Sequence, residues 1–156
     1  MENFKQTNLD DNILRAISEM GFATPTTVQA KTIPHLLNTD TDLIATAQTG
    51  TGKTAAFGLP SIHLTDLKKK DTSTLVLCPT RELCIQIAKD LTKYSKYIDG
   101  LKILAVYGGS DIRGQIKALN KGVHIVIGTP GRTKDLIKRD KLKIGNIARI
   151  VLDEAD

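Results

Sequence analysis

Eight residues in the first third of the chain have the types and spacing of a phosphate-binding loop. They read Ala47-Gln48-Thr49-Gly50-Thr51-Gly52-Lys53-Thr54. Gly50 and Gly52 lack side chains, so the backbone can curl and direct several N–H groups at one point. Lys53 can reach the outer phosphates of a nucleotide, and the Thr54 hydroxyl can bind Mg²⁺. Ala47 departs from the usual pattern, which opens with glycine.

Two carboxylates near the end of the sequence could complete such a site. The apolar run 150–152 leads directly into Asp153 and Glu154. Asp153 could hold Mg²⁺ opposite Thr54, and Glu154 could polarise the water that attacks the γ-phosphate. Each carboxylate alone could be an ordinary surface charge. Together with Lys53 and Thr54 they predict a site for a nucleoside triphosphate.

Alternating strand and helix patterns must position these residues. Apolar runs predict strands at 43–45, 75–78, 103–107, 123–128 and 150–152, and amphipathic patterns predict helices at 53–66, 81–97, 112–120 and 131–139. This alternation predicts an α/β fold, with a parallel β-sheet sandwiched by helices. Ligands of such sheets bind beyond the carboxyl ends of the strands, where all the candidate motifs fall. A position between strand and helix also disfavours the alternative that 47–54 is a chance glycine-rich turn.

Two further helices are expected before the phosphate-binding loop. Asp10 or Asp11 can cap a helix that ends at Gly21. Residues 22–29 predict a turn and then the start of a second helix, and Pro34 is expected to break that helix and to open another helical turn through Leu37. We expect region 1–40 to pack on a core formed by 41–156 within one domain.

Composition sets the class of protein. The chain has 156 residues, 40% of them hydrophobic and 25% charged, which is ordinary for a soluble globular protein. It contains neither a run long enough to cross a membrane nor the apolar core of a signal peptide. A cytoplasmic protein without a membrane partner is therefore expected. The net charge of +5 mildly supports a polyanionic partner.

The cysteines and histidines show no metal-ligand spacing. Cys78 and Cys84 lie in apolar runs without a Cys-x-x-Cys pattern, so we expect buried thiols. His35, His63 and His124 are expected to be structural or surface residues.

Six motifs in order resemble those of one family. Residues 153–156 spell DEAD, and nearly the whole chain resembles the first RecA-like domain of a DEAD-box RNA helicase. The other motifs are the Q motif at 21–29, motif I at 47–54, motif Ia at 79–83, the GG motif at 108–109 and motif Ib at 129–132. An opening alanine in motif I, as at Ala47, is normal for this family.

The resemblance implies a site for ATP and Mg²⁺. The Gln29 amide can donate and accept together, which suits the N6/N7 edge of adenine and not guanine. Phe22 would stack on adenine, with a core aromatic as the alternative. The implied nucleotide-binding residues are Phe4, Phe22, Thr24, Gln29, Thr49, Gly50, Thr51, Gly52, Lys53 and Thr54. Lys53, Asp153 and Glu154 would be catalytic, with Thr54 and Asp153 at the metal.

The resemblance also implies an RNA-binding track. Arginines, hydroxyl groups and the N–H groups of a helix start suit phosphates. On the residues alone, Arg81 and Arg132 could equally form surface salt bridges. Contact with the RNA backbone carries no base code, so binding would be independent of sequence. The implied residues are Pro79, Thr80, Arg81, Gly108, Gly109, Thr129, Pro130, Gly131 and Arg132.

Two features depart from the family pattern. Thr133 and Lys134 stand where apolar residues usually follow motif Ib, and Lys134 adds a positive charge near the RNA track. The sequence also lacks the Ser-Ala-Thr motif and the second RecA-like domain, the implied partner in ATP hydrolysis. By resemblance, the Ser-Ala-Thr strand would lie between strands 43–45 and 150–152. We expect it to belong to the molecule but to lie outside this sequence; otherwise the two strands pair directly or recruit a strand from another chain.

Three hypotheses follow. The first is the ATP- and RNA-binding N-terminal domain of an RNA helicase that unwinds short duplexes, with the isolated fragment inactive or nearly so. The second is a nucleotide-dependent RNA-binding module without turnover. The third is a DNA-directed helicase or translocase, which the Q motif and the spelling DEAD disfavour.

Overall fold

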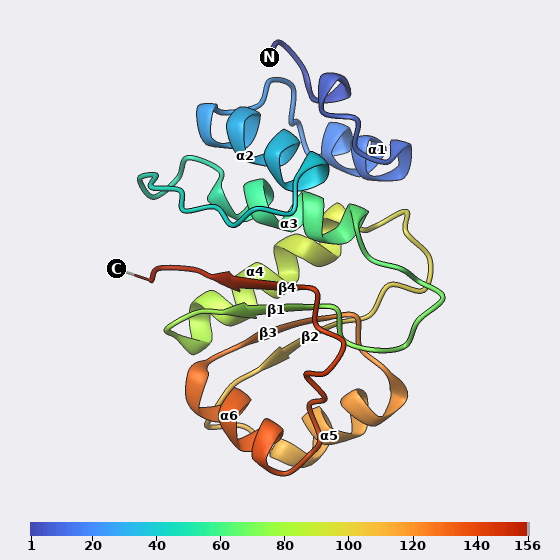
Figure 1. Ribbon diagram of the computed structural model, residues 1–156, viewed down its shortest axis with the longest axis vertical. Coiled ribbons are helices and arrows are strands. Elements are labelled where there is room, and N and C mark those ends of the chain that lie inside the picture. Colours follow the sequence, from blue (N-terminus) through green and yellow to red (C-terminus); the bar gives the residue numbers. More distant parts are fainter. Residues whose placement is uncertain (156) are drawn as a thin grey trace. The chain divides into compact units, whose positions relative to one another are not determined.

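The chain folds as two compact units in the computed structural model, which describes residues 1–155 (Figure 1). The first unit comprises Met1–Leu64 and Asp90–Asp99. The second comprises Thr65–Lys89 and the chain from Gly100 onward. Asp156, the last letter of the predicted DEAD motif, lies outside the described residues. The predicted boundary between residues 40 and 41 stays a prediction.

The first unit is helical. It contains the short helix η1 (Phe4–Thr7), α1 (Asp11–Glu19), α2 (Thr27–Asn38), α3 (Lys53–His63) and the last turns of α4 (Arg81–Tyr94). The Asp10 side chain accepts a hydrogen bond from the Asn12 backbone N–H at 2.8 Å and so caps α1, as predicted. The unit closes around fully buried apolar side chains: Ile13, Ile17, Ile33, Leu59 and Leu91.

The predicted break at Pro34 is wrong, because α2 continues through this residue to Asn38. An interior proline removes one backbone hydrogen bond at a cost of about 3 kcal/mol. Burial of Ile33 and Thr32 offsets that cost, since α2 packs against α3. The Asn38 side-chain amide also donates to the Pro34 carbonyl at 2.8 Å, which supports the last turn.

The second unit contains a parallel sheet, as predicted, but the sheet has four strands instead of the five expected. Its strands are β1 (Thr74–Leu77), β2 (Ile103–Val106), β3 (Ile125–Gly128) and β4 (Arg149–Leu152), in the order β2-β3-β1-β4. Helices α5 (Ile112–Lys121) and α6 (Pro130–Lys138) lie together against one face (Figure 1). Apolar side chains of the strands and these helices form one core there: Leu75, Val106, Val126, Leu136, Ile112 and Ile116. The crossover helices therefore hold the carboxyl ends of the strands in a fixed arrangement.

The predicted strand at 43–45 is wrong. These residues form no strand, and the sheet consists of β1 to β4 within the described chain. The side chain of Ile44 is 94% exposed. An apolar run becomes a strand only where a neighbouring strand offers hydrogen bonds and packing. Within residues 1–155, the strand that pairs with β4 is β1.

The cysteine and histidine predictions are confirmed in their burial and contacts. Both thiols are buried, and burial raises the pKa of Cys78 to about 12 and also raises the pKa of Cys84. His124 is buried, and its Nδ1 accepts the Lys102 N–H at 2.9 Å. Within residues 1–155, every helix is too short or too polar to cross a bilayer.

Candidate functional site

The phosphate-binding loop curls at its two central glycines. Gly50 and Gly52 both have left-handed backbones, with φ of +82° and +81°. The Thr51 hydroxyl donates to the Gln48 carbonyl at 2.6 Å and tightens the turn. Helix α3 then begins at Lys53, and Gly52 at its N-cap makes no side-chain cap. A helix start that follows such a turn suits an anionic group, so this geometry fits a nucleotide phosphate.

Gln29 ties the Q-motif segment to this loop. Its side-chain oxygen accepts the Thr26 N–H at 3.0 Å, and the Thr26 hydroxyl accepts the Gln29 N–H at 3.4 Å, which forms a capping box at the start of α2. Its amide nitrogen donates to the Gly52 carbonyl at 3.2 Å. The fit is close, because a Cβ on Gly52 would lie 2.3 Å from that nitrogen. Gln29 is thus 3% exposed and held against the phosphate-binding loop.

The aromatic residues of the Q-motif segment pack in a row. The Phe22 ring lies 5.9 Å from the Phe4 ring and 5.9 Å from the Tyr94 ring, centroid to centroid. Phe4 is buried, whereas Phe22 is partly exposed and Thr24 is exposed. The role of Phe22 at the adenine ring stays a prediction, and its contacts show how the ring is held in place.

The carboxylates of the DEAD segment follow β4 directly. The Asp153 N–H donates to the Leu77 carbonyl at 2.9 Å and extends the pairing of β4 with β1. The Asp153 side chain accepts the Glu154 N–H at 3.1 Å. Glu154 has a φ of +54°, a left-handed conformation that is uncommon for this residue type and is found at functional sites. The turn therefore positions both carboxylates at the end of the strand.

The predicted catalytic residues divide between the two units. Lys53 and Thr54 belong to the first unit, and Asp153 and Glu154 belong to the second. Their joint action on ATP and Mg²⁺ stays a prediction. The pairs fit such a role in chemistry, since a hydroxyl and a carboxylate are the oxygen ligands that Mg²⁺ prefers.

Arg81 lies against the loop after β2. Its guanidinium carbon is 4.9 Å from the centroid of the Tyr107 ring, a cation–π contact. A Cβ on Gly109 would lie 3.5 Å from Arg81 Nη1, so the glycine lets the arginine approach the loop. Motif Ia and the GG motif therefore meet beyond the ends of β1 and β2.

Arg132 joins the same loop from α6. Its guanidinium donates to the Ser110 carbonyl at 3.1 Å and to the Gln115 side-chain oxygen at 3.0 Å. Within residues 1–155 neither Arg81 nor Arg132 forms an ion pair, so the salt-bridge alternative is not what the structure contains. The hydrogen bonds of Arg132 go to uncharged partners, and beside that of Arg113 its positive charge also helps to lower the pKa of the Asp111 carboxyl.

Gln115 is a further residue of the candidate site, and the sequence did not predict it. It is 7% exposed, and its amide donates to the Tyr107 carbonyl at 3.3 Å and to the Ser110 hydroxyl at 2.9 Å. The side chain therefore links the GG loop to Arg132. One signal was available, because Gln115 stands among Ile112, Ile116 and Leu119 on the inward face of an amphipathic helix. A polar residue on that face needs buried partners.

The remaining RNA-track residues lie at the same carboxyl ends of the strands. The Thr80 hydroxyl accepts the Leu83 N–H at 3.2 Å and caps α4. Thr129 is the N-cap of α6 and makes no side-chain cap, and its N–H donates to the Val106 carbonyl at 3.0 Å. The glycines and prolines of these motifs are exposed: Pro79, Gly108, Gly109, Pro130 and Gly131. The second unit thus brings all nine predicted residues to one edge of its sheet.

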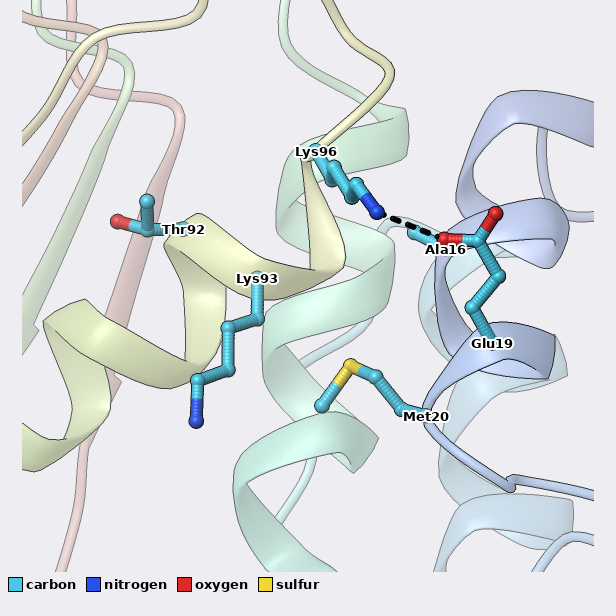
Figure 2. Close-up of a pocket in the computed structure, with 6 residues that line it drawn as sticks. All are labelled: Ala16, Glu19, Met20, Thr92, Lys93 and Lys96. Atoms are coloured by element: carbon cyan, nitrogen blue, oxygen red, sulfur yellow. Dashed lines mark hydrogen bonds and ion pairs between the residues drawn. The ribbon is translucent and has the colours of Figure 1, made fainter.

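A groove in the first unit is separate from these motifs. It lies between α1 and the end of α4 and is lined by Ala16, Glu19, Met20, Thr92, Lys93 and Lys96 (Figure 2). The Lys96 ammonium pairs with the Glu19 carboxylate at 2.9 Å. None of these six residues belongs to a predicted site.

Comparisons with known proteins agree with this geometry. The family model described as DEAD/DEAH box helicase matches residues 26–156. The chain is 51% identical to the ATP-dependent RNA helicase CshA of Listeria monocytogenes, over all of this chain and 30% of that protein. It is 48% identical to CshA of Bacillus cereus, over all of this chain and 29% of that protein. It is 45% identical to the ATP-dependent RNA helicase DeaD of Escherichia coli, over 98% of this chain and 24% of that protein.

The fold is that of a solved relative. A crystal structure of a DEAD box protein from the hyperthermophile Methanococcus jannaschii matches with a TM-score of 0.93 and 47% identity, over 99% of this chain and 42% of that chain. The chain thus spans about 30% of the length of CshA from Listeria and Bacillus. Matched over most of its length by the family model and by these relatives, this chain belongs to the DEAD/DEAH box helicase family.

Proposed function

We propose that this chain is the ATP- and RNA-binding N-terminal domain of an ATP-dependent RNA helicase. In this role, binding and hydrolysis of ATP are coupled to local unwinding of short RNA duplexes. The names of the relatives support the activity. The main structural support for the nucleotide site is the hydrogen bond from the Gln29 amide to the Gly52 carbonyl. Because the chain spans about 30% of the CshA relatives, turnover and unwinding are proposed for a protein of their length.

The nucleotide site of this proposal is built on the first unit. Gln29 reads the adenine edge while it stays in contact with the phosphate-binding loop, so base recognition and phosphate binding are mechanically linked. Phe22 stacks on the base, and Lys53 provides the positive charge for the outer phosphates. A guanine base presents acceptors where adenine presents a donor, so the site discriminates against GDP and GTP.

The hydrolytic step uses the two carboxylates that follow β4. Thr54 and Asp153 would hold Mg²⁺, which would neutralise charge on the phosphates. Glu154 orients and polarises the attacking water. Closure of a second RecA-like domain completes the site, which is why an isolated first domain is expected to hydrolyse little ATP.

RNA binds at the edge of the sheet in the second unit. Arg81 and Arg132 contact phosphates, and the backbone N–H groups at the start of α6 contribute further donors. These contacts involve the sugar-phosphate backbone, so affinity varies little with base sequence.

Calorimetry with ADP and GDP tests the nucleotide assignment on this chain. We expect measurable ADP binding and weaker GDP binding, together with salt-sensitive binding to unrelated RNA sequences. Equal affinity for ADP and GDP would contradict the adenine site. A strong preference for one RNA sequence would contradict backbone recognition.

The alternative is a nucleotide-dependent RNA-binding module without turnover. The observation that leaves it open is the division of Lys53 and Asp153 between two units. Phosphate release by a protein of the relatives' length, with and without RNA, separates the two functions. RNA-stimulated release supports the helicase, and its absence in the presence of tight binding supports the module.

A further inference from the structure

Helix α6 is seated with a defined face toward solvent. Thr133 and Leu136 are buried, and a Cβ on Gly128 would lie 2.1 Å from the Thr133 hydroxyl oxygen. The missing side chain of Gly128 therefore lets α6 sit directly on β3. With positions 133, 136 and 137 turned toward the core, the helical repeat places 131, 134, 135 and 138 on the outward face.

The outward face carries positive charge that the protein does not neutralise. Asp135 pairs with Arg139 at 2.9 Å, and Asp140 pairs with Lys143 at 2.6 Å. Lys134, Lys138 and Lys141 are exposed, and within residues 1–155 none of them forms an ion pair at the distance of these two. Lys141 lies close enough to Asp140 to help Lys143 lower the pKa of that carboxyl. Among the described residues, Lys134 and Lys138 are therefore the ammonium groups of α6 without an acidic partner.

Positive charge is also concentrated in this part of the sequence. Residues 112–149 contain ten basic and two acidic residues, a net charge of +8. The rest of the chain contains twelve basic and fifteen acidic residues, a net charge of −3. The chain's overall charge of +5 therefore comes from the segment that includes α5 and α6, which is typical of a surface that faces a polyanion.

The lysines lie on the helix that carries Arg132, on its outward face, whereas Arg132 lies to one side of that face. Arg132 lies in the first turn of α6, and Lys138 lies six residues later, about 9 Å further along the helix axis. Lys134 and Lys138 are four residues apart, so their Cβ atoms are about 5–6 Å apart on one face. Positions 131, 134, 135 and 138 include no apolar side chain, and a protein partner would need apolar anchors. A phosphate backbone needs only the charges.

We propose that Lys134, Lys138 and Lys141 bind further phosphates of the RNA strand that Arg132 contacts. This inference rests on the proposed RNA-binding function and extends it to a surface outside the recognised motifs. It assigns a longer binding site to this chain, with up to three additional phosphates held along α6. Affinity is therefore expected to rise with RNA length beyond what the motif residues can contact.

Fluorescence anisotropy with labelled RNA of two lengths tests the proposal. The probes are homopolymers of about 6 and about 12 nucleotides, within the range of sites on single-strand binding proteins. We expect the Lys134→Ala/Lys138→Ala variant to bind the short probe as the unmodified chain does. It should lose on the order of 10-fold in affinity for the long probe at ~0.1 M salt, and its salt slope should fall by about 1.4.

Lys68→Ala/Lys69→Ala is the matched control. It removes the same charge from the exposed segment before β1, at the opposite edge of the same sheet from the RNA track. Equal losses in the two variants would overturn the proposal in favour of a general effect of net charge. The proposal would also be overturned if the Lys134→Ala/Lys138→Ala variant bound the short probe normally and still gained as much affinity with RNA length as the unmodified chain. Failure of the unmodified chain to bind either probe would instead remove the proposed RNA-binding function, and the inference with it.

Discussion

Gln29 uses both ends of its side-chain amide within the first unit. The oxygen accepts from the Thr26 backbone and the nitrogen donates to the Gly52 carbonyl. Each group retains capacity for one more hydrogen bond, because an amide has two N–H donors and two acceptor lone pairs. In the proposed nucleotide site, Gln29 would contact the base without releasing the loop, and it would connect base identity to loop geometry.

Gln29→Ala should weaken ADP binding and abolish the preference over GDP. The loss of a bidentate contact with adenine costs about 1–3 kcal/mol. Isothermal titration calorimetry with both nucleotides measures this change. Gln29→Glu is a matched variant that keeps the acceptor oxygen and removes the donor to Gly52. Undiminished selectivity in both variants would refute the role of Gln29.

Lys53→Ala should make ADP binding undetectable at millimolar nucleotide. The phosphate oxygens lose a charge-assisted partner, whereas the backbone of the loop needs only its glycines. Titration followed by nucleotide fluorescence measures the change, and a thermal melt checks that the fold persists. Lys31→Ala removes an exposed lysine from α2 of the same unit and should leave binding intact. Retention of affinity in Lys53→Ala would mean that the phosphates bind elsewhere.

The start of α3 shows how one element meets two demands. Its turn needs a left-handed backbone at Gly50 and at Gly52, which is easiest for glycine. Only Gly52 is also in close contact with another segment, since no atom lies within 4 Å of a Cβ placed on Gly50. Position 50 therefore favours glycine for its backbone conformation alone, whereas position 52 also needs glycine because Gln29 lies so close.

Gly52→Ala should reduce ADP binding more than Gly50→Ala does. Both substitutions impose a left-handed backbone on alanine, at about 1–2 kcal/mol. Only the methyl group at position 52 would displace the Gln29 amide. Urea unfolding should show similar losses of stability, while calorimetry should show a further loss of affinity in Gly52→Ala. Equal affinities would indicate that the Gln29–Gly52 contact does not support the nucleotide site.

Helices α5 and α6 meet through the bond between Gln115 and Arg132. Gln115→Ala should lower RNA affinity several-fold without changing how steeply that affinity depends on salt, because the charge of Arg132 remains. Arg132→Ala should lower the affinity and also the salt dependence, whose slope should fall by about 0.7 for the lost phosphate contact. Binding titrations over a range of salt concentrations distinguish the two variants. Asn120→Ala, an exposed change on α5, should have no effect; an equal effect would reduce Gln115 to a structural residue.

At the scale of the whole molecule, β4 forms an edge of the sheet in the second unit. Ile150 and Leu152 are each 62% exposed, and among residues 1–155 β4 pairs with β1 on one side only. An unpaired edge with apolar side chains is a template for association with another chain.

We expect the chain to self-associate as its concentration rises. Ile150→Lys/Leu152→Lys should suppress this association, because charged side chains protect exposed edges. Sedimentation velocity across a concentration series measures it. Ile144→Lys changes an exposed isoleucine in the loop before β4 and should leave association unchanged. A chain that stays monomeric at all concentrations would show that the β4 edge does not drive association.

The sequence by itself determined the elements and motifs that depend on local chemistry. The glycines of the phosphate-binding loop, the Asp10 cap and the apolar strands β1 to β4 were all evident, because backbone freedom, capping and periodicity are properties of short segments. The meeting of Arg81, Gly109 and Arg132 also followed from the sequence, since parallel strands bring their carboxyl ends to one edge.

Only the tertiary structure decided the features that depend on distant partners. Residues 43–45 resemble a strand but form none within residues 1–155, and Pro34 is accommodated because α2 packs against α3. The roles of Gln115 at Arg132 and of Gln29 at Gly52 arise from hydrogen bonds across 17 and 23 residues. A short stretch of sequence does not show whether such a partner is present or where it lies. Tertiary packing therefore decides whether a segment with strand or helix propensity forms that structure.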